Sequence, residues 1–360
     1  MQKTVKKPAY MGQHTAASIL YESGKWRQVP LLEHNQGRLP PNIIVVGDRR
    51  RATSEQTRTT AAQYLEQVVD LVQYGKQLCG DGGRVNLLAG IYRHKNMRIP
   101  VTIVETQMGM SAQHINLLEI MCLASPDGYT VPVDERTSVA YPKEGLTVIR
   151  VGSCGGINSD YGDKAVPPVI KIGDLVIAES SFGHSGNIYQ ALGGLDYLSD
   201  AAKLRIARRV KELGLSFIDN FLAVYSSLNV VGALSSAAWA LVKDGQMDFQ
   251  TGILVGGNVS KDSLSCEEDC DGAGLAEFLE LRRTRNVMST EMEHLGIGFL
   301  AALFSESGIP VQHGLISGVV GALPEHSFYS NPEEKLMAEA AEANAMKVGL
   351  LALRNLSMRR

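Results

Sequence analysis

The sequence is poor in cysteine and has no long apolar run. Five cysteines stand in 360 residues, an odd number that predicts no disulfide framework and fits a reducing compartment. Cys266 and Cys270 are four residues apart, which is not a usual zinc spacing, and no second Cys or His pair follows them, so we expect no metal site. No stretch is apolar over the length of a membrane-spanning helix. Segment 1–14 is basic but precedes no hydrophobic region, so we expect no secretory signal and a cytoplasmic protein.

Neither sign of charge dominates the chain. Its 35 Lys and Arg residues and 38 Asp and Glu residues leave a formal net charge of −3. This balance argues against nucleic acid or an anionic membrane as the main partner. Any anionic ligand must therefore be held locally, by a few well-placed cations.

Four common catalytic motifs are missing. The sequence contains no G-x-x-x-x-G-K-[ST], no G-x-G-x-x-G that opens a helix, no H-E-x-x-H and no G-x-S-x-G. Their absence argues against a P-loop nucleotidase, a dinucleotide-binding enzyme, a zinc protease and a serine esterase. We expect no cofactor, and we expect the chemistry to rest on another arrangement.

The order of apolar segments predicts one α/β domain with a mixed central β-sheet flanked by helices. Short buried strands are expected at 43–46, 100–104, 147–151, 174–178, 252–255 and 314–320. Helices are expected at 52–78, after Ser111, and at 199–213, 287–306 and 332–356. Residues 1–41 read as an N-terminal extension, 42–360 as the domain, and 125–145 as an inserted loop rich in proline and charge. Ligands of such sheets bind where strands end, so the glycine-rich segments there are the candidates for a site.

Two arginine-containing segments could hold an anion. Gly47 ends the first strand, and Arg51 stands where a helix is expected, which suits phosphate; a glycine turn followed by solvated charges is the alternative. Arg150 lies inside an apolar strand, where burial is costly unless it meets an anion, and Ser153 follows in a glycine-rich segment. An arginine paired with a structural carboxylate is the alternative there.

Two further segments could hold a sugar. Glu291, Met292 and Glu293 precede an apolar helix, where Glu293 could accept hydrogen bonds from a ribose cis-diol or simply cap the helix. Met108, Gly109 and Met110 join a strand to a helix, where backbone N–H groups could reach a sugar or phosphate. A plain loop with core methionines is the alternative.

Taken together and in this order, the four segments resemble the uridine and purine nucleoside phosphorylase family, over roughly residues 30–325. The resemblance implies a nucleoside phosphorylase-like fold. It implies that phosphate is held by Gly47, Arg51, Arg84, Arg150 and Ser153. It places the ribose at Met108, Met292 and Glu293, and makes Arg51, Arg150 and Glu293 the catalytic residues. Arg84 would reach in from a neighbouring subunit, which implies a homodimer or a higher homo-oligomer.

The chain departs from the family at the base. Uridine-specific members carry a Phe-Tyr-x-Gly-Gln-x-Arg segment, and the matching stretch 262–268 lacks the Gln and the Arg, so the base-binding residues are unknown. By composition, Gln246, Arg282, Arg283 and Arg285 are candidate donors to the base. Purine-cleaving members of the bacterial type carry an Asp near the end of the late strand, and segment 318–323 has none. Asp48-Arg49 also replaces the usual Asp-Pro.

These residues predict phosphorolysis of a pyrimidine nucleoside, in which uridine and inorganic phosphate give uracil and ribose 1-phosphate. A phosphorylase of purine nucleosides (inosine or methylthioadenosine) would share the phosphate site but need an acid at the base. A nucleosidase uses water and needs no cluster of phosphate-binding arginines. A weakly active regulatory or structural partner is an alternative of another class.

Overall fold

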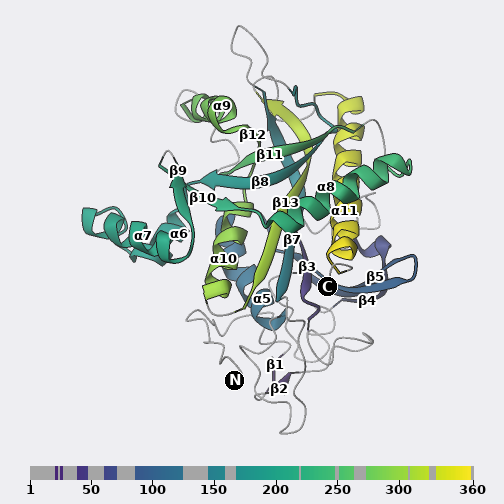
Figure 1. Cartoon of the computed structure of the whole chain (residues 1–360), viewed down its shortest axis with the longest axis horizontal. Coiled ribbons are helices and arrows are strands. Elements are labelled where there is room, and N and C mark those ends of the chain that lie inside the picture. Colours follow the sequence, from purple (N-terminus) through teal and green to yellow (C-terminus); the bar gives the residue numbers. More distant parts are fainter. Residues whose placement is uncertain are drawn as a thin grey trace.

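The computed structural model describes residues 21–22, 25–26, 39–47, 61–70, 86–124, 145–158, 168–218, 220–247, 251–262, 273–306, 309–323 and 330–357. An eleven-stranded sheet flanked by helices dominates these residues (Figure 1). The predicted single α/β domain with a mixed sheet is confirmed. The predicted 1–41 extension and 125–145 loop lie largely outside the described residues.

The strands of this sheet are β3 (Asn42–Val46), β4 (Leu65–Asp70), β5 (Asn86–His94), β6 (Met97–Glu105), β7 (Leu146–Ile157), β8 (Leu175–Gly183), β9 (Ser216–Ile218), β10 (Phe221–Tyr225), β11 (Ile253–Ser260), β12 (Val287–Glu291) and β13 (Val311–Leu323). Strands β1 (Tyr21–Glu22) and β2 (Lys25–Trp26) form a separate antiparallel pair. The helical elements are η1 (Ala61–Tyr64), α4 (Met110–Ala112), the π-helical η2 (Gln113–Leu117), α5 (Leu118–Ala124), α6 (Gly186–Gly193), α7 (Asp200–Glu212), α8 (Leu228–Lys243), α9 (Ala273–Arg285), α10 (His294–Glu306) and α11 (Pro332–Ser357).

Part of the sheet closes on itself. Strand β3 lies parallel between β6 and β7, and β4, β5 and β6 form an antiparallel edge. Strand β7 then pairs with both β12 and β13. Because β12 pairs with β11, β11 with β8, and β8 with β13, these five strands form a ring.

Helices cover both faces of the sheet. In β3, Ile43 and Val45 pack into a core shared with α5 and α10, whereas Ile44 and Val46 pack into a core shared with α8 and α11. Figure 1 shows α11 along one side of the long strands and α10 on the other. Burial on both faces explains why the strand is apolar throughout rather than alternating.

The helix predicted at 52–78 is wrong over residues 65–70, whereas residues 61–64 form the 3-10 helix η1. Residues 65–70 form the edge strand β4, which pairs antiparallel with β5. Leu65 lies opposite Tyr92, and Glu66 lies opposite Ile91. A neighbouring strand supplies the backbone hydrogen bonds here, and this tertiary pairing overrides a spacing that also suits a helix.

The helix predicted at 287–306 is two elements. Residues 287–291 form β12, with every residue buried, and α10 begins at His294. A short apolar run does not distinguish a buried strand from a buried helix. The break at 292–293 matters because it places Glu293 in a turn between the two elements.

The strand predicted at 147–151 continues to Ile157. Its glycines serve close packing rather than a turn. A Cβ atom at Gly156 would lie 2.6 Å from a side-chain carbon of Ile170, and one at Gly155 would lie 3.2 Å from a methyl carbon of Thr290. The glycine-rich segment is therefore part of the ring of strands.

Candidate functional site

A buried ion pair forms the centre of the candidate site. Nη2 of Arg150 lies 2.7 Å from Oε2 of Glu293, and the two side chains are 3% and 4% exposed. Arg150 comes from the middle of β7, beside Val45 of β3. Glu293 comes from the turn between β12 and α10. Residues 143 positions apart thus meet at the end of β3.

Two glycines make room for the Arg150 guanidinium. A Cβ atom at Gly152 would lie 2.7 to 2.9 Å from its three terminal atoms, and one at Gly47 would lie 3.0 Å from Nη2. The guanidinium also donates from Nη1 to the carbonyl oxygen of Val151, at 2.5 Å. Its Nε is buried and has no hydrogen-bond partner among the described residues. Gly47, predicted to admit a phosphate, thus lies directly against the arginine predicted to bind it.

The turn that follows β6 supplies the other contact to Glu293. The backbone N–H of Gly109 donates to Oε1 of Glu293, at 3.1 Å. Gly109 has φ of +92°, a conformation that favours glycine. Gln113 and Asn116 from the following helix donate to Thr106, which fixes the turn. The backbone N–H of Gly109 thus binds Glu293, and contact of this segment with a sugar or phosphate stays a prediction.

These contacts set the charge of Glu293. Burial acts to raise the pKa of Glu293, but the Arg150 guanidinium and the Gly109 N–H outweigh it, so the pKa lies below its ordinary value. Glu293 is therefore a carboxylate at neutral pH, which accepts hydrogen bonds and donates none.

Glu291 performs the helix capping that was the alternative for this segment. Its carboxylate accepts from the backbone N–H groups of Glu293 and His294, and so caps α10. Asn258 and Ser260 of β11 also donate to it. Burial, followed by the charge of Glu293, raises the pKa of Glu291 to about 7. One carboxylate of the pair thus holds the turn, and the other faces Arg150.

A chain of hydrogen bonds leads away from Glu291. Asn258 donates to Oγ of Ser181, at 2.9 Å, and that hydroxyl lies 2.7 Å from Nδ1 of His294. Nε2 of His294 lies 3.3 Å from Nδ1 of His313. The tautomers of His294 and His313 decide which partner donates in these two contacts. Sequence reasoning missed this network, because its members come from four different strands and helices.

Burial keeps both histidines neutral. It lowers the pKa of His313 to about 4. It also lowers the pKa of His294 well below the ordinary value, and the neighbouring His313 and Arg150 add to the effect. The network behind the ion pair is therefore uncharged at neutral pH.

The other predicted site residues are less closely gathered. Met292 is half-buried in the turn beside Glu293. Met108 is 69% exposed in the turn before Gly109. Ser153 follows Arg150 by three positions in one strand, so the two side chains point to opposite faces. Arg51 and Arg84 lie outside the described residues.

Three of the candidate donors to the base lie away from the pair of Arg150 and Glu293. Gln246 lines a pocket beside α11 and not the Arg150 pair. Arg283 pairs with Glu280 on the surface of α9. Arg282 is buried, and it donates to the carbonyl oxygen of Pro168 and to the side chain of Asn286. Segment 263–268 of the stretch matched to the family's uracil-reading motif lies outside the described residues.

No protein-family model and no curated protein matches the sequence. Solved structures do match it, over nearly the whole chain. A nucleoside phosphorylase from Trypanosoma brucei, described as showing uridine phosphorylase activity, has a TM-score of 0.57 and 18% identity, covering 93% of this chain and 99% of its own. This chain has the nucleoside phosphorylase fold. The purine nucleoside phosphorylase of Toxoplasma gondii, solved with immucillin-H, also has a TM-score of 0.57, with 16% identity, covering 94% of this chain and 99% of its own.

None of the described helices is both long and apolar enough to cross a membrane. Within the same residues, no group of three or more His, Cys, Asp or Glu side chains could hold a metal ion.

Proposed function

We propose that this protein cleaves a pyrimidine nucleoside such as uridine with inorganic phosphate, releasing the base and ribose 1-phosphate. The observation that carries the proposal is the buried pair of Arg150 and Glu293. A guanidinium suits a phosphate, and a carboxylate that only accepts hydrogen bonds suits a cis-diol. The two halves of the pair thus match the two substrates of a phosphorylase.

The proposed reaction begins with phosphate held against Arg150. Gly47 leaves room for the anion, and Arg51 and Arg84 add charge, with Arg84 donated across the interface of a homodimer or higher homo-oligomer. Glu293 accepts hydrogen bonds from the ribose hydroxyls, while Met108 and Met292 contact the sugar and Ser153 contacts the phosphate through its backbone.

The chemistry is a substitution at C1′. The bond between C1′ and the base nitrogen lengthens, and positive charge grows on the sugar. The phosphate dianion stabilises this charge and then forms a bond to C1′. The base leaves with the bonding electron pair and takes up a proton. Catalysis rests on positioning and preorganised charge, and it needs no metal.

Substrates would separate the ion pair. The Nε group of Arg150, which has no partner among the described residues, is a spare donor for a second phosphate oxygen. When phosphate neutralises the guanidinium, the Glu293 carboxylate becomes available to the diol. This exchange predicts that phosphate and nucleoside bind cooperatively.

The choice of uridine rests on the sequence of β13. Segment 318–323 at the end of this strand carries no Asp to protonate a purine. The two structural neighbours act on different bases, so a purine nucleoside is the second candidate. A weakly active regulatory partner would keep the ion pair closed and turn over nothing.

The test measures by chromatography how much free base the protein releases from uridine and from inosine. Each nucleoside is incubated with and without phosphate. Uracil released only with phosphate is the expected result. Hypoxanthine as the main product moves the specificity to purines, and release without phosphate identifies a nucleosidase. Failure with both nucleosides over a range of phosphate concentrations contradicts the proposal.

A further inference from the structure

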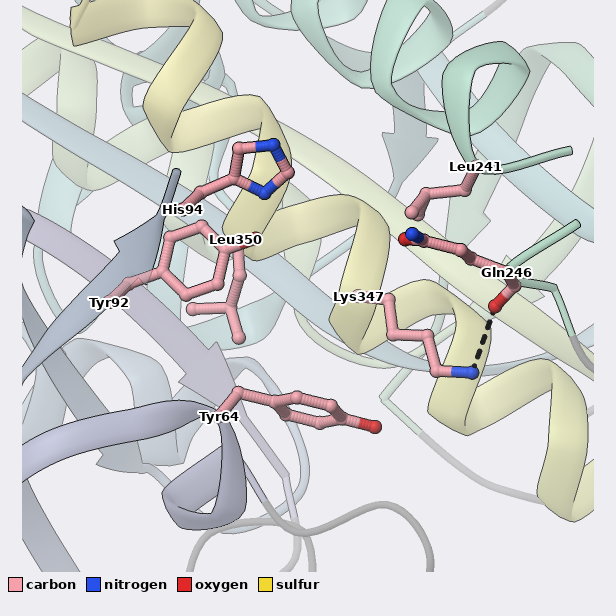
Figure 2. Close-up of a pocket in the computed structure, with 7 residues that line it drawn as sticks. All are labelled: Tyr64, Tyr92, His94, Leu241, Gln246, Lys347 and Leu350. Atoms are coloured by element: carbon pink, nitrogen blue, oxygen red, sulfur yellow. Dashed lines mark hydrogen bonds between the residues drawn. The ribbon is translucent and has the colours of Figure 1, made fainter. Parts of the chain in front are cut away.

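We propose a second ligand site, for a small planar anion, on the face of the sheet opposite the Arg150 pair. A pocket of about 280 Å³ lies there between η1, β5, the end of α8 and α11. Figure 2 shows the side chains that line it: Tyr64, Tyr92, His94, Leu241, Gln246, Lys347 and Leu350.

The pocket is separated from the candidate active site by the sheet. A Cβ atom at Gly349 of α11 would lie 2.8 Å from a methyl carbon of Val151, so Val151 points to the α11 face. The neighbouring residue Arg150 points to the other face, as successive residues in a strand do. Because Lys347 and Leu350 of α11 line the pocket, a ligand there lies away from Arg150 and Glu293.

Aromatic rings and leucines give the pocket its planar, apolar surfaces. The rings of Tyr92 and His94 are 6.3 Å apart and tilted by 37°. Tyr64 lies below them in Figure 2 and comes from a different element, η1. Leu241 and Leu350 are 5% and 0% exposed and provide the apolar base. Surfaces of this kind accept the face of a flat ring.

The charges around the rings are mainly positive. Nζ of Lys347 lies 3.1 Å from the carbonyl oxygen of Gln246, at the rim (Figure 2). The charge of Arg354 acts on both Tyr92 and His94, and that of Lys95 acts on His94. Asp244 is the acidic group that acts on His94. Among the described residues that act on these rings, cations thus exceed carboxylates, which favours an anionic group beside the stacked ring.

The pocket itself contributes no further charge at neutral pH. Burial, then the charges of Arg354 and Lys95, lowers the pKa of His94, so its ring is neutral and can stack. Burial raises the pKa of Tyr92, which therefore keeps its proton. The selectivity for an anion comes from Lys347 and the neighbouring cations.

The size limits the ligand to one flat ring system with one anionic group. Ligand pockets usually measure roughly 300–1,000 Å³, and this one lies at the lower end. A nucleoside monophosphate and an aromatic carboxylate share the required chemistry. These two sources are distinguished by experiment.

The test uses the full-length protein with Arg150→Met and Glu293→Gln combined, so that the proposed active site is silenced. Uridine 5′-monophosphate, benzoate and neutral uridine are titrated separately by calorimetry. We expect saturable binding of one or both anions, and binding of uridine at least about tenfold weaker, since a charged contact is lost. Binding of the monophosphate alone identifies a nucleotide site, and binding of benzoate alone identifies a carboxylate site.

Variants then locate the binding. Lys347→Gln is expected to weaken binding of the anion by about tenfold, because the substitution removes the positive charge at the rim of the pocket. Lys335→Gln, on an exposed turn of the same helix, is the matched control and should change nothing. Chemical shifts of the His94 ring follow the titration without any change to the pocket. No saturable binding of either anion at millimolar concentration, or binding that neither needs Lys347 nor shifts His94, would overturn the proposal.

Discussion

Arg150 and Glu293 approach each other to 2.7 Å in a part of the protein where both are almost fully buried. Each residue neutralises a charge that would otherwise be stranded away from water. The same two residues are the proposed ligands of phosphate and ribose. Their contributions to stability and to catalysis therefore need to be separated by experiment.

The variant Arg150→Met is expected to lose phosphorolysis and also to lose stability. Removing the guanidinium leaves Glu293 buried without its partner, which costs about 3–5 kcal/mol. Denaturant unfolding of this variant and the parent protein measures the loss. A variant as stable as the parent would show that Glu293 finds another partner or becomes protonated.

The double variant Arg150→Met and Glu293→Gln is expected to regain much of that stability while staying inactive. The amide carries no charge, so no buried carboxylate is left unpaired. A double-mutant cycle built from unfolding free energies gives the coupling between the two residues. Recovered turnover in the double variant would exclude both residues from catalysis.

The strands nearest this pair were predictable and their continuations were not. The apolar runs at 43–46 and 147–151 predict buried strands, and both are present as parts of β3 and β7. The glycines after Val151 gave no strand signal, but they continue β7, and the space they provide is occupied by Arg150, Thr290 and Ile170. Such contacts join distant segments, so sequence spacing does not reveal them.

Glu293→Gln alone is expected to weaken the binding of the nucleoside far more than the binding of phosphate. The amide replaces a charged acceptor of the ribose hydroxyls, so KM for uridine should rise by roughly 10–100-fold. KM for phosphate should change by much less. The 2′-deoxy nucleoside serves as the internal control. Because it lacks one hydroxyl, its KM should rise by a smaller factor in this variant. Equal losses for both substrates would refute the ribose-binding role.

The glycines around the guanidinium should tolerate alanine unequally. A Cβ at Gly152 would lie 2.7 to 2.9 Å from all three terminal atoms of Arg150, whereas one at Gly47 would lie 3.0 Å from Nη2 and 3.7 Å from both the guanidinium carbon and Oε1 of Glu293. Gly152→Ala is therefore expected to lower turnover and melting temperature more than Gly47→Ala. Gly232→Ala in α8 is the control, because nothing lies within 4 Å and alanine there should stabilise the helix by about 0.5–1 kcal/mol. The reverse order of the first two variants would contradict this packing.

Stability should fall as the pH is lowered below about 6.5. His294 and His313 stay neutral in the folded protein but take up protons when the chain unfolds. Each of them therefore lowers the free energy of unfolding by up to about 1.4 kcal/mol for every pH unit below about 6.5. Glu291 acts in the opposite direction, because its pKa of about 7 lets the fold hold a proton that the unfolded chain releases above about 4.5. The net contribution of these three groups is therefore about that of one histidine, and His94, His114 and His184, whose pKa values burial also lowers, add to it in the same direction.

The variant His313→Gln isolates this effect. It leaves His294 and Glu291 with opposing slopes, so the slope of the unfolding free energy against pH should fall by up to about 1.4 kcal/mol per pH unit between about 5 and 6.5. Denaturant melts of the variant and the parent at several pH values provide the comparison. An unchanged slope in the variant would show that His313 is not the titrating group.

The candidate site was predictable in its residue types more than in its arrangement. Arg150 and Glu293 stand out as an arginine within a strand and a carboxylate before a helix. That they bind each other depends on β12 ending at Glu291, a boundary hidden within an apolar run that also suits a helix. The His294 and His313 network has no local signal at all, because buried histidines are recognised only by their partners in space.

The central claim is that a bond forms between phosphate and C1′ of the nucleoside. ³¹P nuclear magnetic resonance of the protein with uridine and phosphate observes that bond directly. The proposed function predicts a ribose 1-phosphate signal that grows as inorganic phosphate declines, and no such signal for Arg150→Met combined with Glu293→Gln. Uracil and free ribose formed with the phosphate signal unchanged would contradict it.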